Sequence, residues 1–338
     1  MTEDANTQNP SAPDVADPEA ILVGIDGSKA SRNALRWAIG EAKALGRSIR
    51  LVGAYTIPSV TAATIDVSYV PIDDTAIRAS VTATLKEAAA EVKAADIPVE
   101  AVIEIGDAAG VLVEESKAAS LAVVGSRGRG GFAGRLLGTV SSALPAHSAC
   151  PTVVIPVGWT QDGERAPKQT ASRPIRHYEH GVIDTDSEME TVPGMDFSDS
   201  VVVGVDSLGK DSPALWEAAS LAAQRGTPLH IVGVTITAVV GPEWLPSTGD
   251  MRRFIDESSG ALIDARDALN EKHPDLTVRW TLFDGQPAEV LVRASDTADV
   301  LVIGSRGRGG FAGLLLGSTS QSVLPYAKCP TMVVRVSR

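Results

Sequence analysis

The sequence predicts an α/β protein built from two doubly wound (Rossmann-like) domains in tandem. Short Val/Ile runs bounded by glycine, such as ILVG and LAVVG, alternate with alanine-rich stretches that have helical spacing. Buried parallel strands are continuous apolar runs that need crossover helices, so this alternation indicates a parallel sheet with helices on both faces. Because the pattern occurs twice, we expect two five-stranded parallel sheets, each flanked by about four helices.

The duplication extends along most of the chain. ILVGID at 21–26 reappears as VVVGVD at 201–206, and the run CPTVVIPV that closes the first copy reappears as CPTMVVRV near the end of the second. The segments between these landmarks match in the same order. We therefore predict one domain over 19–157 and a second over 199–338.

Local signals predict where the helices begin and end. Gly46 closes an alanine-rich stretch and is suited to the left-handed position after a helix. In the second copy, Ser212 and Pro213 are typical of an N-cap followed by the first helical position. The expected helices of the first copy cover residues 31–46, 73–95, 108–119 and about 138–147.

Two segments lack these patterns. Residues 1–18 are acidic, contain no apolar core of a signal peptide, and are predicted to be a disordered tail. Residues 158–198 are polar and irregular, and we interpret them as a solvated linker, the alternative being a regulatory or docking segment. No apolar run approaches the roughly 20 residues that cross a bilayer. We therefore expect a cytoplasmic protein without a membrane partner.

Charge and cysteine content exclude several classes of protein. The 338 residues carry a formal net charge of −12. This argues against a general nucleic-acid binder, which presents a basic face. The two cysteines, Cys150 and Cys329, are too few for a disulfide framework. They occupy equivalent positions and are interpreted as small buried residues, the alternative being a metal or redox pair.

The most informative motif is a glycine- and arginine-rich loop present in both copies. GSRGRGGFAG is identical over ten residues at 125–134 and 304–313, and each time it follows a Val/Ile strand and precedes a helix. Glycines let backbone N–H groups point inward, the helix N-terminus adds a positive dipole, and arginines add cationic donors. The pattern therefore predicts a phosphate site at the carboxyl edge of each sheet.

The spacing within this motif is Gly-x₂-Gly-x₉-Gly followed by a hydroxyl residue, with a serine two positions further on. The residues concerned are Gly125, Arg127, Gly128, Gly138, Thr139 and Ser141 in the first copy, and Gly304, Arg306, Gly307, Gly317, Ser318 and Ser320 in the second.

Both copies resemble the universal stress protein family, whose ATP-binding members carry G-x₂-G-x₉-G-[S/T]. The resemblance covers nearly the whole chain outside the tail and the linker. It implies one ATP site per domain, with the motif residues at the phosphates and ribose. It also implies that Asp26 and Asp206, after the first strands, lie at the nucleotide and at its Mg²⁺. Ala54 and Val234 match the position that reads the adenine edge through backbone groups.

The second copy departs from the family pattern after its first strand. The family often has Asp-x-Ser there, and Asp26 followed by Gly27 and Ser28 fits this pattern. The second copy has leucine at position 208 in place of the hydroxyl residue. We therefore expect the second site to bind more weakly or differently.

The resemblance implies a nucleotide-dependent regulatory or stress-response protein. Two alternatives are a weak Mg²⁺-dependent ATP hydrolase or nucleotidyl-transfer enzyme, and an RNA-binding protein that uses the RGRGG loops. No second acid or base beside Asp26 is evident for efficient turnover, so no catalytic residue is assigned. Gly204-x₄-Gly209-Lys210 resembles a P-loop, but Asp211 follows where that motif needs Ser or Thr.

The last strand of each copy is apolar and needs a cover if it forms a sheet edge. The resemblance implies pairing through this strand. The partner is either the other half of the same chain, which gives a pseudo-dimer, or a second chain in a homodimer.

Overall fold

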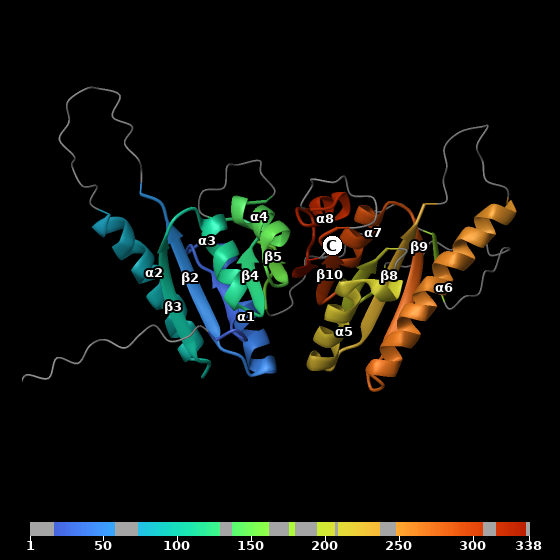
Figure 1. Cartoon of the computed structure of the whole chain (residues 1–338), viewed down its shortest axis with the longest axis horizontal. Coiled ribbons are helices and arrows are strands. Elements are labelled where there is room, and N and C mark those ends of the chain that lie inside the picture. Colours follow the sequence, from blue (N-terminus) through green and yellow to red (C-terminus); the bar gives the residue numbers. More distant parts are fainter. Residues whose placement is uncertain are drawn as a thin grey trace, which may run out of the picture.

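The protein is described by a computed structural model over residues 17–57, 74–128, 137–161, 176–179, 195–206, 209–236, 248–306 and 316–335. These residues form two α/β halves that lie side by side, with α2 and α6 at the two outer ends (Figure 1). No helix in this part of the chain is both long and apolar enough to span a membrane.

The first half follows a regular alternation of strand and helix. Its elements are β1 (Ile21–Gly24), α1 (Lys29–Leu45), β2 (Ile49–Tyr55), α2 (Thr75–Lys93), β3 (Val99–Ile105), α3 (Ala108–Glu115), the short 3₁₀ helix η1 (Ser116–Ala118), β4 (Leu121–Gly125), α4 (Thr139–His147) and β5 (Thr152–Ile155).

The second half repeats this order of strands and α-helices, but its 3₁₀ helix follows the first strand instead of the third α-helix. Its elements are β7 (Val201–Val205), η2 (Gly209–Asp211), α5 (Pro213–Arg225), β8 (Leu229–Thr235), α6 (Thr248–Lys272), β9 (Val278–Asp284), α7 (Pro287–Ala294), β10 (Val300–Gly304), α8 (Ser318–Val323) and β11 (Thr331–Val334).

All strands among the described residues belong to one 11-stranded sheet, whose strand order is β3-β2-β1-β4-β5-β11-β10-β7-β8-β9-β6. Within each half the repeated strands are parallel in the doubly wound order 3-2-1-4-5, so the predicted fold class is confirmed. Side chains of each strand alternate between two cores. In β1, Ile21 and Val23 face the core under α1 and α2, whereas Leu22 faces the core under α3 and α4.

The two halves are joined through their last strands. Strands β5 and β11 pair antiparallel, with Val153 opposite Met332, and both side chains are buried. Each half thereby covers the apolar edge of the other, as predicted for an intramolecular pseudo-dimer. A homodimer of two such chains would have to use another surface.

The linker prediction needs one correction. Strand β6 (Arg176–Glu179) lies within the segment expected to be irregular, and it pairs antiparallel with β9, with Tyr178 opposite Leu282. The sheet is therefore not purely parallel. Pairing at a sheet edge uses backbone groups, so a short polar strand can form there without an apolar alternation in its sequence.

Helix boundaries follow the local signals closely. Helix α1 begins at Lys29, slightly earlier than predicted, because the Ser28 hydroxyl accepts a hydrogen bond from the Ser31 N–H (3.1 Å) and acts as N-cap. Gly46 ends this helix in the left-handed conformation, with φ 66°. Ser212 and Pro213 hold the N-cap and first positions of α5, as predicted.

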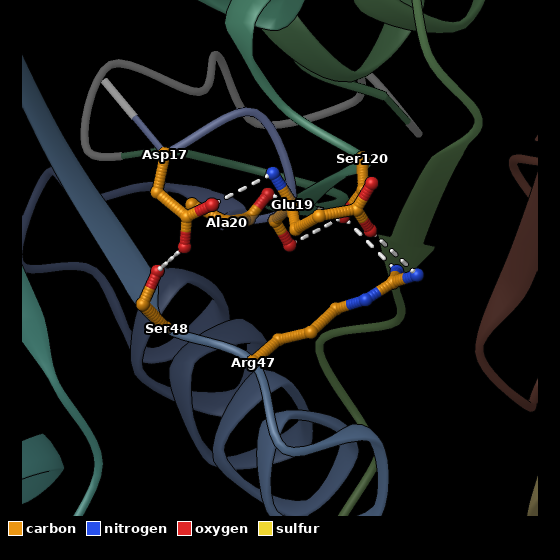
Figure 2. A network of polar contacts seen from close by, with 6 residues as sticks. All are labelled: Asp17, Glu19, Ala20, Arg47, Ser48 and Ser120. Atoms are coloured by element: carbon orange, nitrogen blue, oxygen red, sulfur yellow. Dashed lines mark hydrogen bonds and ion pairs between the residues drawn. The ribbon is translucent and has the colours of Figure 1, made fainter. Parts of the chain in front are cut away.

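A polar network fixes the turns at the amino ends of β1, β2 and β4 (Figure 2). Asp17 accepts hydrogen bonds from the Ser48 hydroxyl (2.6 Å) and from the Glu19 N–H (3.0 Å). Arg47 pairs with Glu19 (3.1 Å) and donates to the Ser120 hydroxyl (3.0 Å). This network lies at the amino ends of these strands. The predicted glycine loops follow β4 and β10, so they lie at the opposite side of the sheet, at the carboxyl ends of the strands.

Both cysteines are buried, and neither forms a disulfide bond. Burial raises the pKa of the Cys150 thiol, which opposes formation of the reactive thiolate. Among the described residues there is no cluster of three or more His, Cys, Asp or Glu side chains that could hold a metal ion.

Candidate functional site

The predicted loop follows β4, which pairs in parallel with β1 at the centre of the first sheet. The strand that follows β1 in the sequence, β2, lies on one side of this pair, and the strand that follows β4, β5, lies on the other side. Ligands of doubly wound folds bind at such a topological switch point, outside the carboxyl ends of the strands. Residues that follow β1 and β4 therefore converge where a ligand is expected.

Asp26, after β1, lies directly beside the second glycine of the motif. A Cβ atom added to Gly128 would come within 2.6 Å of Asp26 Oδ2. The other carboxylate oxygen, Oδ1, accepts a hydrogen bond from the Ser28 N–H (2.9 Å). The carboxylate is thus oriented by its own turn toward the backbone of the loop.

Two hydrogen bonds connect the two ends of the loop, and a third lies within its second end. The Gly138 N–H donates to the Ser126 carbonyl (2.9 Å) and also to the Ser141 hydroxyl (3.0 Å). The Ser141 hydroxyl in turn donates to the Ser126 carbonyl (2.8 Å). These bonds set Gly138 at the N-cap of α4, with Arg127 Cα and Gly128 N each 3.6 Å from the point where its Cβ would be. Residues 129–136 lie outside the described part of the chain.

The hydroxyl residues of the motif differ in their surroundings. Ser141 is buried, and its hydroxyl is engaged within the loop. The Ser28 hydroxyl caps α1 and donates to the Arg127 carbonyl at 3.4 Å, so it links the β1 turn to the loop. Thr139 is exposed at the first position of α4. It is the hydroxyl best placed to meet a ligand at this helix N-terminus.

The first glycine of the motif is explained by packing alone. A Cβ atom on Gly125 would lie 2.5 Å from the Ala30 backbone carbon and 2.6 Å from the Ala30 Cβ. Helix α1 therefore approaches β4 so closely that no side chain fits. This contact brings the positive end of α1 next to the loop.

Ala54 lies at the carboxyl end of β2, beside β1, and is partly buried. The next residue, Tyr55, donates a hydrogen bond to Asp74 Oδ2 (2.6 Å) at the start of α2, and this bond raises the pKa of the tyrosine. The segment around Ala54 is therefore anchored. Val234 has the equivalent place in β8 of the second half.

The second half reproduces much of this arrangement. The Gly317 N–H donates to the Ser305 carbonyl (2.6 Å), and the buried Ser320 hydroxyl donates to the Gly304 carbonyl (2.7 Å). Ser318 is exposed at the first position of α8. The Arg306 Nε atom is buried without a hydrogen-bond partner in the described structure, and Gly307 lies outside the described residues.

The turn after the first strand differs between the halves. Helix α1 begins three residues after Asp26, whereas α5 begins seven residues after Asp206, because η2 intervenes. Gly209 of η2 has φ 49° and packs so tightly on α6 that a Cβ would lie 2.8 Å from the Ala261 carbonyl oxygen. Positions 207 and 208, where the sequence departs from the family pattern, lie outside the described residues.

An ion pair between the halves was not predicted. Glu41 of α1 is buried and pairs with Arg225 of α5, whose guanidinium lies 5.3 Å from the centre of the Trp37 ring. The one signal in the sequence is that Glu41 falls on the apolar face of α1, next to Ala38 and Ala42 in helical spacing. Its partner Arg225 lies 184 positions away in the sequence, so no local sequence pattern indicates the pair.

Comparison with known proteins places both halves in one family. The model of the universal stress protein family matches residues 18–156 and 198–335. Universal stress protein Rv2623 of Mycobacterium tuberculosis is 30% identical over 334 residues, which cover 94% of this chain and 96% of that protein. Universal stress protein Rv1996 of the same organism is 28% identical over 340 residues, which cover 94% and 95% of the two chains.

A solved structure has the same fold. A universal stress protein from Archaeoglobus fulgidus superposes with a TM-score of 0.57 and 24% identity, covering 94% of this chain and 97% of that one. The two family matches in one chain and the extensive relatives agree with the repeated doubly wound sheets. The chain is thus a member of the universal stress protein family with two tandem domains.

Proposed function

We propose that each half binds an adenine nucleotide at the carboxyl edge of its sheet, and that the chain acts as a nucleotide-dependent regulatory protein in a stress response. The observation that carries this proposal is the convergence of Asp26, Gly128 and Gly138 at the switch point between β1 and β4. Two glycine backbones and a helix N-terminus meet there, which is the chemistry of an anion cradle.

The position of Asp26 suggests ATP with a bound metal ion, or a contact to the ribose. A carboxylate beside a phosphate is repulsive unless a cation bridges them, and Mg²⁺ is commonly held by one or two carboxylates together with substrate phosphates. Asp26 and, in the second half, Asp206 would supply that single carboxylate. The metal would neutralise phosphate charge, while Arg127 and the loop backbone orient the nucleotide.

Titration calorimetry with ATP, ADP, AMP and cyclic AMP, each with and without Mg²⁺, tests the proposal. Absence of heat with all four would refute it. Fast multiple-turnover release of phosphate that disappears in Asp26→Ala would favour the enzyme alternative. Retention of RNA at physiological salt would favour the RNA-binding alternative.

The Gly138→Ala variant separates binding from folding. A methyl group at this position meets nothing closer than 3.6 Å, so we expect the fold to persist at a cost of about 0.5 kcal/mol or less for the poorer N-cap. The same methyl points into the space between Arg127 and Gly128, so we expect nucleotide affinity of the first site to fall at least tenfold. Gly110→Ala in α3 is the matched control and should bind like the parent protein.

The count of bound nucleotide tests the expected difference between the halves. Native mass spectrometry of the freshly purified chain should show two nucleotides when both sites are filled. On dilution, the second site should empty first, because its turn lacks the Ser28 hydroxyl and contains η2. Loss of the remaining nucleotide in Asp26→Ala, but not in Asp206→Ala, would assign the tighter site to the first half.

A further inference from the structure

A cavity of about 890 Å³ lies between the two halves. The first half lines it with α1 and with residues 156–161, which follow β5. The second half lines it with the end of α5 and with the segments that precede β10 and β11. Because β5 and β11 run antiparallel, the carboxyl end of one meets the amino end of the other at this place.

This cavity is separate from the nucleotide cradle. Asp26, Gly128 and Gly138 do not line it, although Ser126 and Arg127 at the base of the loop reach its wall. It is also built from both domains, whereas each cradle belongs to one. The cavity therefore exists only because the halves pair.

Three described residues that line the cavity each carry a buried polar atom without a partner. In the part of the chain that the structure describes, Glu41 Oε1, Arg225 Nε and Thr227 Oγ1 are buried without a hydrogen-bond partner, and all three residues line the cavity. The Glu41 side chain is only 1% exposed, and its other oxygen pairs with Arg225. These atoms are buried even from water, so they lie beneath the surface of the cavity and would meet an occupant only if their side chains turned.

A glycine in the middle of α1 lines the cavity at an exposed position. Gly40 lies in a helix interior, where glycine is less favourable than alanine. A Cβ atom there would meet nothing within 4 Å, so close packing does not require the glycine. Gly40 lines the cavity, and any larger side chain at this position would occupy it.

The lining selects an aromatic anion. The lining residues include four cationic side chains and three carboxylates. The whole chain has a net charge of −12, so the wall of the cavity is far less acidic than the rest of the molecule. Trp159 and Tyr326 supply flat apolar surface, whereas the Trp37 ring is buried beneath the Arg225 guanidinium. The volume falls within the range of sites for small organic ligands. The charged lining residues are Arg36, Arg127, Arg225 and Lys328, with Glu41, Asp296 and Asp299.

We propose that this inter-domain cavity is a second, non-nucleotide site that binds a small aromatic compound bearing one carboxylate, phosphate or sulfonate group. The ring packs against Trp159 and Tyr326, and the anionic group lies toward Arg36, which is not among the residues assigned to the nucleotide site. Trp159 belongs to the first half and Tyr326 to the second, so an occupant of the cavity contacts both domains.

Fluorescence titration of the full chain with 8-anilinonaphthalene-1-sulfonate tests the site, since this probe is an aromatic sulfonate. N-phenyl-1-naphthylamine is the matched neutral probe. We expect one sulfonate probe per folded chain, bound at least tenfold more tightly than the neutral probe. Saturating ATP should leave the sulfonate probe in place. Equal binding of the two probes, or displacement by ATP, would overturn the proposal.

Two variants locate the probe. Gly40→Phe fills the cavity and should abolish binding, whereas Gly260→Phe, in the interior of α6 with equally open surroundings, should not change it. Arg36→Gln, at an exposed position, should weaken the sulfonate probe at least fivefold and leave the neutral probe unchanged. Parental affinity in both Gly40→Phe and Arg36→Gln would refute the assignment. Displacement by benzoate or by phenyl phosphate then distinguishes the carboxylate from the phosphate class, and displacement by neither counts against the site.

Discussion

The three glycines of the loop motif are glycines for different physical reasons. Gly125 is required by the approach of α1, Gly128 by the carboxylate of Asp26, and Gly138 has ordinary space around its missing side chain. A sequence motif treats these positions as equivalent. The structure explains the first by packing against α1 and the second by the Asp26 carboxylate, and it shows no packing reason for the third.

Gly125→Ala should destabilise the protein without any ligand present. The added methyl would overlap backbone atoms of Ala30, and overpacking of this kind costs about 1–3 kcal/mol. Urea unfolding of Gly125→Ala and of the control Gly110→Ala measures the difference. Equal stability of the two variants would show that α1 can shift away from β4 at little cost.

Asp17 in the network of Figure 2 makes stability depend on pH. The hydrogen bond from Ser48, followed by that from the Glu19 N–H, lowers the pKa of Asp17 below its ordinary value of 3.8. A carboxylate with a lowered folded-state pKa stabilises the fold above the unfolded-state value, and this contribution is lost as pH falls through the folded-state value. Asp17→Asn should therefore unfold at a lower temperature than the parent at pH 7. The two melting temperatures should converge as the pH falls below the folded-state pKa of Asp17, and a constant difference would contradict this account.

At the scale of elements, α5 carries a carboxyl group in an unfavourable place. Burial raises the pKa of Glu217 above its ordinary value of 4.5, and Arg47 of the first half only partly opposes this effect. The charged form is thus disfavoured in the folded state, so stability falls as pH rises from the unfolded-state pKa through the raised folded-state pKa.

Glu217→Gln should raise the melting temperature at pH 7, and the gain should disappear at pH 4. Calorimetric scans at the two pH values measure it. Glu114→Gln, at an exposed position that pairs with Lys117, is the control and should not stabilise the protein. A gain that is the same at both pH values would point to packing rather than to charge.

Local sequence signals predict elements well where short-range chemistry defines them. The serine cap and terminal glycine of α1, and the Ser-Pro start of α5, act within one helical turn. Strand β6 was not predicted, because its four polar residues are ordered by the exposed edge of β9 rather than by their own pattern.

At the scale of the whole molecule, the halves are held by a strand pair and by a buried ion pair. Removing one member of a buried ion pair leaves an uncompensated charge and costs about 3–5 kcal/mol. We expect Arg225→Met to lose about 3 kcal/mol in urea unfolding, because Glu41 remains buried. Glu41→Met combined with Arg225→Met should recover most of this loss. Additive losses in the double variant would mean that the two side chains are not coupled.

The sequence by itself determined that the chain contains two copies of one α/β unit, and that each copy carries a glycine loop between a strand and a helix. It also brought Asp26 and the loop glycines to one sheet edge, because the carboxyl ends of neighbouring parallel strands meet there. These features follow from periodicity, caps and spacing. The sequence also indicated that the apolar last strands need a partner, but only the tertiary structure decided that β5 and β11 pair within one chain. The contact of Glu41 with Arg225 and the cavity beside it were likewise decided by the tertiary structure, because they join residues about 180 positions apart whose contact leaves no periodic or local signal.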